Sequence, residues 1–373
     1  MRIFTVNGSS VTEAEAKTSL TQARLPEQGY LWIAFERPEF ELMQLQIQAA
    51  LQALCGMQLV DLHISDLLNK QLPSHYDYTS QYDLLVFRRL GTGRKENDPA
   101  PPDVPLSPAS ARRGPPILRH INTSPVGFAV FDHVLLTVHP ADCAVLEAYA
   151  AKLRISASAH SHAAGARPPS SPADLMLRIV NHMVDGYLEL RRELTRQLDH
   201  WQNELLKPRT RFNNWGALLD ARLSLHHLDE ICEDQRSAVQ DWIEAIKTWP
   251  DAATAEGQRE RDLLQVRSRD VLEHIERVVH HVRRLEQSAE TAVQMHFNAQ
   301  SHRANEIMRT LTVLTAIFLP LNLIAGIFGM NFEFIPLLHL SYGFWFAMAF
   351  MLVTALGLVV FFWRKRYLER SAR

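Results

Sequence analysis

The stretch that decides the fold lies near the carboxyl end, where residues 310–332 are TLTVLTAIFLPLNLIAGIFGMNF and residues 334–363 are FIPLLHLSYGFWFAMAFMLVTALGLVVFFW. These runs of 23 and 30 residues are interrupted by one charged side chain, Glu333. Each run exceeds the roughly 20 apolar residues that a helix needs to cross a bilayer core. The alternative is a pair of buried core helices, which seldom lack charges over such lengths. The segment therefore predicts two C-terminal transmembrane helices.

Basic residues set the expected orientation of these helices. Arg303 and Arg309 precede the pair and residues 364–366 (Arg-Lys-Arg) follow it, whereas the connector over 329–339 holds no Lys or Arg. Loops rich in Lys and Arg stay in the cytoplasm. We therefore expect a multi-pass protein of the cell (inner) membrane, in contact with the lipid bilayer, with both termini cytoplasmic.

The remaining composition excludes several classes of protein. The chain of 373 residues has a net charge of −2, and because residues 310–373 contribute +3, residues 1–309 carry −5. This acidic part lacks the basic footprint of a nucleic-acid-binding protein. Three scattered cysteines (Cys55, Cys143, Cys232) predict a reducing compartment rather than a disulfide framework. The first ten residues lack the apolar core of a signal peptide.

One face of the first apolar run collects polar and small residues. Positions spaced by alternating threes and fours share this polar stripe: Asn305, Met308, Thr312, Thr315, Leu319, Asn322, Gly326 and Gly329. Polar groups are costly in hydrocarbon and tend to face a bundle interior or a water-filled cavity. Helix packing through Thr and Gly is the alternative, but a carboxamide near mid-membrane, Asn322, favours a pore. Two spans cannot enclose a pathway, so a pore needs several copies of the chain.

The same spacing continues upstream as an apolar stripe from Val271 to His296. No Pro or Gly interrupts residues 258–319. This pattern is typical of one long helix packed in a bundle. We expect it to run from about Ala255 to Phe328, roughly 110 Å at 1.5 Å per residue.

The rest of the chain is expected to be an α/β cytoplasmic domain followed by helices. Residues 30–35, 82–88, 126–131 and 134–138 are typical of strands, and residues 41–55 of a helix. The expected organisation is an α/β domain over 1–158 with a Pro-rich loop at 91–116, a linker over 159–172, an antiparallel helical pair over 173–248, a stalk helix over 251–328, a loop over 329–339, a second span over 340–363 and a basic tail over 364–373.

Gly329-Met330-Asn331 directly follows the first span, within a segment that starts at Asn305-Glu-Ile-Met-Arg and ends at Pro336. This segment resembles the CorA family of divalent-cation channels, which carry Gly-Met-Asn at the outer end of the first of two C-terminal spans. The resemblance is strongest over about residues 265–366. It implies a homopentameric channel for Mg2+, with Co2+ and Ni2+ as further cargo.

The resemblance also implies roles for individual residues. It assigns Gly329, Met330 and Asn331 to a selectivity filter. It assigns the pore wall to Asn305, Met308, Leu311, Thr312, Leu319 and Asn322, although Leu311 lies just off the stripe and packing against a neighbouring helix is its alternative role. Mg2+ prefers oxygen ligands and loses water reluctantly, so a ring of neutral carbonyl oxygens suits the hydrated ion.

One feature departs from the family pattern. Family members often have an acidic residue soon after the loop proline, whereas Leu337 and Leu338 follow Pro336 here. Glu333 is then the only acid at the outer mouth. We expect weaker electrostatic capture of cations there.

Two acidic residues in the soluble part resemble regulatory ligands of the family. Asp66 lies in the segment from Leu62 to Asn69, and Asp270 lies near the start of the long helix. The resemblance implies that Asp66 and a neighbouring subunit's Asp270 share a regulatory Mg2+ ion that closes the channel. The alternative is that both are ordinary surface residues.

Enzymatic functions find no support in the motifs. The sequence has no P-loop, no complete dinucleotide fingerprint and no His-Glu-x-x-His, so we expect neither an enzyme nor an organic cofactor. Two alternatives to Mg2+ uptake stay open. One is Zn2+ transport, as in the ZntB-like branch of the superfamily, and the other is a membrane-anchored scaffold or sensor that conducts nothing.

Overall fold

The computed structural model of the chain describes residues 1–8, 10–14, 20–91, 122–158, 168–206, 215–249, 254–330 and 342–365. Most of the expected Pro-rich loop, linker and basic tail lies outside these residues, as do Asn331 and Glu333. The chain divides into two compact units, residues 1–290 and 291–373. Each unit is described by itself.

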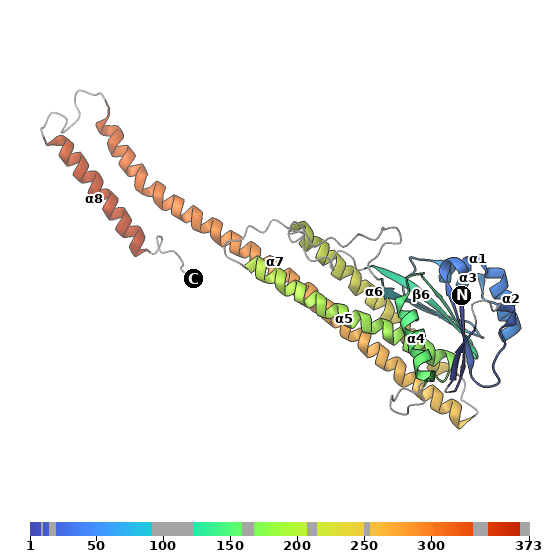
Figure 1. The fold of residues 1–373 in the computed structure, drawn as a ribbon. Helices are drawn as coiled ribbons and strands as arrows, with labels where there is room; N and C mark the ends of the chain where they lie inside the picture. Colours follow the sequence, from blue (N-terminus) through green and yellow to red (C-terminus); the bar gives the residue numbers. More distant parts are fainter. Residues whose placement is uncertain are drawn as a thin grey trace. The chain divides into compact units, whose positions relative to one another are not determined.

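The first unit is built on a mixed seven-stranded sheet (Figure 1). The strands are β1 (Arg2–Asn7), β2 (Ser10–Glu13), β3 (Tyr30–Glu36), β4 (His75–Tyr78), β5 (Asp83–Leu90), β6 (Thr123–Val130) and β7 (Val134–His139). Their order in the sheet is β2-β1-β3-β7-β6-β5-β4. The central β3 and β7 are parallel, and every other neighbouring pair is antiparallel.

Both faces of the sheet are covered by helices, and the alternation along β3 shows how. Tyr30, Trp32 and Ala34 belong to one hydrophobic cluster, while Leu31, Ile33 and Phe35 belong to the other. Successive side chains of a strand point to opposite faces. The continuous apolar run YLWIAF is therefore that of a strand buried on both sides.

Three short helices cover one face: α1 (Arg37–Leu42), α2 (Gln44–Cys55) and α3 (Asp61–Leu68). A glycine in β6 lets α3 approach the sheet closely. A Cβ atom added at Gly127 would lie 2.1 Å from Cδ2 of Leu67, a buried residue of α3. Because Asp66 is the neighbour of Leu67, this contact also sets the position of Asp66.

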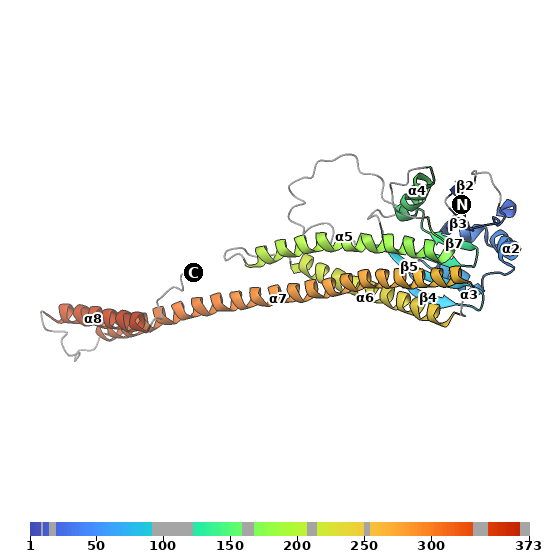
Figure 2. The ribbon, with the colours of Figure 1, turned by 90° about the horizontal axis from the view of Figure 1, so that it is seen from below.

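The other face is covered by α4 (Ala144–Ser158), α5 (Pro172–Leu206), α6 (Trp215–Thr248) and the first part of α7 (Ala255–Phe328). The start of α5 is fixed locally, because Ser171 Oγ accepts a hydrogen bond from the backbone N–H of Asp174 at 3.3 Å. A proline at the first helical position, Pro172, completes a favourable start. Figure 2 shows α5, α6 and α7 running side by side.

The predicted apolar stripe of α7 is buried in the first unit. Val271, Ile275, Val278, Val282, Leu285 and Ala289 all lie within the cluster on this face of the sheet. A polar contact adds to the packing, since Trp242 Nε1 of α6 donates to Ser268 Oγ of α7 at 2.9 Å. The prediction of one long helix is confirmed, because α7 has 74 residues and contains Pro320 without ending there.

The second unit comprises the rest of α7 and α8 (Gly343–Arg364). Both α7 and α8 contain segments long and apolar enough to cross a membrane, by length and composition. Only 6% of each apolar window is buried within the chain. Buried core helices would be mostly covered, so this alternative is wrong for these segments. The predicted fold class of an α/β domain, a long helix and two C-terminal apolar helices is confirmed.

Several elements differ from the sequence expectation. The sheet contains three strands, β1, β2 and β4, that were not expected. The expected helix over 41–55 is two helices, α1 and α2, separated at Met43. Pro38 near the amino end of α1 makes a helix start before residue 41 favourable.

We predict that Gly127→Ala destabilises the first unit by about 1–3 kcal/mol, the usual range for overpacking a core. The added methyl group would force the buried Leu67 side chain to move. Thermal unfolding of the purified protein measures this. The matched control is Gly186→Ala in α5, whose added Cβ has no neighbour closer than 3.9 Å. Equal unfolding temperatures for the two variants would contradict the role of Gly127.

Candidate functional site

The polar stripe of α7 is exposed along its length. Every predicted pore-wall residue of the stripe has an exposed side chain, or exposed backbone for glycine: Asn305, Met308, Thr312, Thr315, Leu319, Asn322 and Gly326. Leu311, just off the stripe, is also 60% exposed. None of these residues is covered by another part of the described chain.

The covered face of the same segment lies on the other side of the helix. Its buried and half-buried apolar residues are Val313, Ala316, Ile317, Pro320, Leu321, Ile324 and Phe328. At 3.6 residues per turn, or about 100° per residue, this set is centred roughly opposite the polar stripe. The second unit therefore uses the apolar face of α7 for packing and leaves the polar face uncovered.

The residues of α8 that are buried or half-buried also form a single face. They are Gly343, Ala347, Met351, Thr354, Ala355, Leu358 and Phe362. Small side chains such as Gly343 and Ala347 allow close approach of helices in membranes. Figures 1 and 2 show α8 beside the last turns of α7. Packing of α7 against α8 within one chain therefore does not account for the polar stripe.

The threonines of the stripe present acceptor oxygens to their surroundings. Thr312 Oγ1 donates to the carbonyl of Met308 at 2.8 Å, and Thr315 Oγ1 donates to that of Leu311 at 2.9 Å. A hydroxyl group has one donor hydrogen and two acceptor lone pairs. Because the hydrogens are used within the helix, the outward-facing parts of these hydroxyls are acceptors, which suits a cation or its bound waters.

The chain leaves α7 at the predicted filter. The backbone N–H of Gly329 donates to Ala325 at 2.9 Å, and that of Met330 donates to Ile327 at 3.3 Å. A Cβ atom added at Gly329 would lie 3.1 Å from the carbonyl oxygen of Ala325. A side chain at position 329 would thus crowd the last helical turn. Asn331 and Glu333 lie outside the described residues, so their predicted roles remain predictions.

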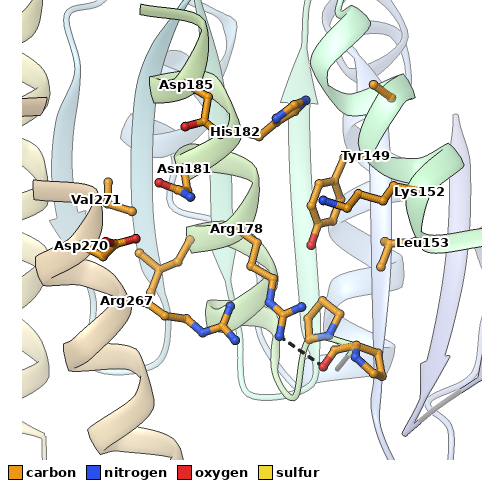
Figure 3. A pocket seen from close by; sticks show the side chains of 14 residues that line it. Tyr149, Lys152, Leu153, Arg178, Asn181, His182, Asp185, Arg267, Asp270 and Val271 are labelled. Atoms are coloured by element: carbon orange, nitrogen blue, oxygen red, sulfur yellow. Dashed lines mark hydrogen bonds between the residues drawn. The ribbon is translucent and has the colours of Figure 1, made fainter. Parts of the chain in front are cut away.

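The two predicted regulatory carboxylates each lie near a histidine. Asp66 Oδ2 is 3.8 Å from His75 Nε2 of β4, and the Asp66 side chain is 19% exposed. Asp270 Oδ1 is 3.8 Å from His274 Nε2 one turn along α7, and the Asp270 side chain is 58% exposed. Asp270 also lines a pocket between α4, α5 and α7 (Figure 3).

One chain does not bring Asp66 and Asp270 together. Asp66 belongs to α3, which packs on one face of the sheet, whereas Asp270 belongs to α7, which packs on the other face. Among the described residues, no group of three or more His, Cys, Asp or Glu side chains is arranged to hold a metal ion. A metal site that uses both carboxylates would need two copies of the chain.

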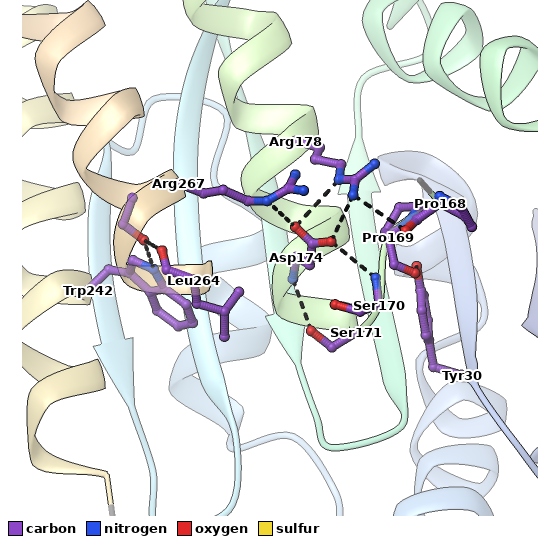
Figure 4. A network of polar contacts seen from close by, with 11 residues as sticks. Tyr30, Pro168, Pro169, Ser170, Ser171, Asp174, Arg178, Trp242, Leu264 and Arg267 are labelled. Carbon is purple, nitrogen blue, oxygen red and sulfur yellow. Dashed lines mark hydrogen bonds and ion pairs between the residues drawn. The ribbon is translucent and has the colours of Figure 1, made fainter. Parts of the chain in front are cut away.

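A fully buried carboxylate near Asp270 was not anticipated from the sequence. Asp174 is 0% exposed and accepts from the backbone N–H of Ser170 at 3.0 Å. Arg178 Nη2 lies 3.1 Å from Asp174 Oδ2, and Arg267 Nε of α7 lies 3.0 Å from Asp174 Oδ1. Figure 4 shows these contacts converging on Asp174. The Ser-Pro-Ala-Asp sequence at residues 171–174 indicates a helix start. It does not indicate that an arginine of α7 contacts Asp174.

Burial in this region also affects pKa values. Burial raises the pKa of the Tyr149 hydroxyl to about 12, with Arg178 opposing the shift. Burial lowers the pKa of Arg267, and Asp174 opposes that shift. At neutral pH, Tyr149 therefore keeps its proton and is a hydrogen-bond donor.

Comparison with known proteins finds a family match over most of the chain and curated relatives over part of it. The family model described as "CorA-like Mg2+ transporter protein" matches residues 27–366. The Cobalt/magnesium transport protein CorA of Thermotoga maritima is 36% identical over 100 residues, which cover 27% of this chain and 28% of that protein. The Magnesium transport protein CorA of Haemophilus influenzae is 35% identical over 101 residues, 27% of this chain and 32% of that protein. These alignments thus span about a third or less of the relatives.

Two solved structures share the fold over nearly the full length. The CorA magnesium transporter from Methanocaldococcus jannaschii superposes with a TM-score of 0.69 at 18% identity, covering 98% of both chains. The full-length CmaX protein superposes with a TM-score of 0.59 at 17% identity, covering 98% of this chain and 97% of that one. At these identities the likeness concerns the fold alone.

We predict that Asp174→Ala lowers stability on the order of 3 kcal/mol, because it leaves two half-buried guanidinium groups without their shared carboxylate. The expected result is a clear fall in the unfolding temperature of the purified protein. An exposed acid of α6, Asp241, supplies the control variant Asp241→Ala. If both variants unfold like the wild type, Asp174 does not hold α5 and α7 together.

Proposed function

The chain belongs to the CorA family, and from this premise we propose that it is a divalent-cation channel that takes up Mg2+ down its electrochemical gradient. Co2+ and Ni2+ are further cargo in this proposal. Transport of an ion breaks no covalent bond, so the proposal assigns no catalytic residue and no organic cofactor. The observation that carries it is the uncovered polar stripe of α7, from Asn305 to Gly326.

The stripe supports a pathway between several copies of the chain. Carboxamides and hydroxyls that face hydrocarbon lose their hydrogen bonds to water, which costs free energy. The Asn322 carboxamide avoids this cost if the stripes of several α7 helices surround a water-filled axis. We take the number of copies as five, which the family resemblance implies.

The filter in this proposal is made by Gly329, Met330 and Asn331. Backbone carbonyls and the Asn331 carboxamide are neutral oxygen donors, which hydrogen-bond to the waters of a hydrated Mg2+ without replacing them. Glu333 lies just beyond and attracts cations to the outer mouth. A neutral ring holds the ion loosely enough for release into the pore.

Apolar members of the pore wall supply the gate. Met308, Leu311 and Leu319 are 65%, 60% and 66% exposed. Narrow rings of such side chains exclude water and thereby stop ions. A small change in the distance between α7 helices would wet or dry these rings. In the proposed orientation, the protein lies in the cell (inner) membrane with the α/β domain and both termini in the cytoplasm. The regulatory carboxylates that control the gate are then cytoplasmic as well.

Cytoplasmic Mg2+ closes the channel in this proposal. Asp66 of one copy and Asp270 of the next share the ion, because a single chain places them on opposite faces of its sheet. Two carboxylates repel each other unless a cation lies between them. Filled sites hold neighbouring copies together, and empty sites let them separate and open the pore, so the ion biases a two-state element.

We predict that Asn322→Leu lowers Mg2+ uptake at least about tenfold, a barrier increase of about 1.4 kcal/mol, because it replaces a polar side chain of the pore wall with an apolar one of similar size. Asn331→Ala should have a similar effect through the filter. Flux into proteoliposomes, with Co2+, Ni2+ and Zn2+ as competitors, measures both.

The control for these variants is Leu314→Ala, on a face of α7 away from the stripe and 52% exposed. It should transport like the wild type. Full uptake by Asn322→Leu would contradict the pore wall. Absence of Mg2+ flux in the wild type would instead favour a scaffold or sensor, and Zn2+ flux without Mg2+ flux would favour the ZntB-like alternative.

We predict that the double variant Asp66→Ala and Asp270→Ala conducts at cytoplasmic Mg2+ concentrations that close the wild type. The inhibitory concentration should rise at least about tenfold, since both carboxylate ligands of the ion are lost. Patch-clamp recording at several cytoplasmic Mg2+ concentrations measures this shift. Asp241→Ala is the control, and an unchanged inhibitory concentration in the double variant would contradict the regulatory site.

A further inference from the structure

The first unit contains a pocket that the transport pathway does not use. Its walls come from α4, α5 and α7, and its volume is about 240 Å3 (Figure 3). This volume lies below the roughly 300–1,000 Å3 of pockets for drug-sized ligands. The pocket therefore suits a small metabolite rather than a nucleotide.

One end of the pocket is basic. Lys152 of α4, Arg178 of α5 and Arg267 of α7 line it. Arg178 and Arg267 both contact the single carboxylate of Asp174, so these four side chains together carry a formal net charge of +2. Arginine and lysine side chains in this arrangement bind phosphate and carboxylate oxygens through charge-assisted hydrogen bonds. The end is thus complementary to an oxyanion.

The Tyr149 hydroxyl adds a neutral donor at this end. Tyr149 is 6% exposed and lines the pocket, and in Figure 3 its oxygen points toward the arginine end. Its raised pKa keeps it protonated at neutral pH. A neutral donor beside cationic groups stabilises a bound anion without adding charge.

The other end of the pocket accepts hydrogen bonds. Asn181, His182, Asp185 and Asp270 line it. Asp185 and Asp270 are exposed, and an ionised carboxylate only accepts hydrogen bonds. A ligand that places an O–H group here would donate it to one of these carboxylates.

These two ends restrict the chemistry of the ligand. A fully deprotonated anion such as sulfate has no hydrogen to donate to the Asp185 and Asp270 carboxylates at that end and would be repelled by their charge. Hydrogenphosphate has oxygens for the basic end and an O–H for the acceptor end. A small hydroxycarboxylate offers the same combination. We propose that this pocket binds a small oxyanion that carries an O–H donor, of the hydrogenphosphate or hydroxycarboxylate class.

The position of Asp270 gives the site a consequence, which rests on the proposed regulatory role of that residue. An anion bound in the same pocket adds negative charge close to Asp270 and so favours a divalent cation there. Linkage is reciprocal, so bound Mg2+ must then increase the affinity for the anion by the same factor. The pocket would let the cytoplasmic supply of the anion adjust the Mg2+ sensitivity of the channel.

Calorimetric titration of the purified full-length protein, in a phosphate-free buffer without divalent cations, tests the site. The probes are inorganic phosphate, sulfate and citrate. The expected result is that phosphate or citrate binds at least about tenfold more tightly than sulfate. Which of the two binds better distinguishes a phosphate site from a hydroxycarboxylate site. Equal affinity for all three probes, or no binding of any, overturns the proposal.

Two variants locate the binding. Lys152→Gln removes an exposed cation and should weaken phosphate or citrate binding about tenfold, a loss of about 1.4 kcal/mol. Asp185→Asn should reduce the preference over sulfate without loss of folding, because Asp185 is an exposed residue of the pocket wall. Lys247→Gln, an exposed cation of α6 outside the pocket, is the control. Wild-type binding by both Lys152→Gln and Asp185→Asn overturns the assignment.

A repeat of the titration with saturating Mg2+ separates the two proposals. If Mg2+ tightens anion binding to the wild type but not to the Asp270→Asn variant, the linkage is supported. Anion affinity that is the same with and without Mg2+ overturns the linkage and leaves the oxyanion site intact. If the wild type binds no anion with or without Mg2+, the oxyanion site is overturned, and the proposed transport function is not affected.

Discussion

Hydrocarbon cannot hydrogen-bond to a carboxamide or a hydroxyl, and this constraint governs the C-terminal unit of the molecule. The apolar part of α7 carries Asn322, Thr312 and Thr315 on one face, and all three are exposed within the chain. The other face packs through Val313 and its neighbours. In a single copy the Asn322 carboxamide would face hydrocarbon, whereas the Thr312 and Thr315 hydroxyls donate to carbonyls of their own helix. We propose that several copies assemble around water, which would satisfy Asn322 and create a pathway for hydrated cations.

The long helix uses one spacing for two purposes. From Val271 to Ala289 the positions spaced by threes and fours are apolar and buried in the first unit. From Asn305 to Gly326 the same spacing brings polar and small residues to the surface. The change from an apolar to a polar stripe along α7 distinguishes the part that packs within the chain from the part that we propose to face water.

The elements that depend on local pattern could be predicted from the sequence. The two apolar segments and the long helix follow from uninterrupted composition and period, and β3 and β7 follow from their apolar runs. The edge strand β4 (His-Tyr-Asp-Tyr) was missed because it is short, polar and only half-buried. The break at Met43 was missed because the apolar pattern continues through it.

The stripe could be predicted as one exposed face because a single helix supplies all its residues, and its role as a pore wall stays a prediction. The candidate site was not predictable where distant segments meet. Asp174 and Arg267 are far apart in sequence, and only the packing of α5 against α7 brings them within 3.0 Å. The placement of Asp66 and Asp270 on opposite faces of the sheet likewise required the fold. That placement turns a resemblance into a specific expectation, namely that any ion they share lies between two copies.

The central claim is that the polar stripe of α7 faces water, and accessibility of substituted cysteines tests it most directly. Thr315→Cys and Leu314→Cys are adjacent positions that differ in face, and both are exposed within one chain. A water-soluble, charged thiosulfonate reacts with thiolates, which form in water and not in hydrocarbon. The account predicts that the reagent modifies Thr315→Cys and blocks its Mg2+ flux, while Leu314→Cys is unaffected. Modification and block of Leu314→Cys with Thr315→Cys unchanged would contradict it.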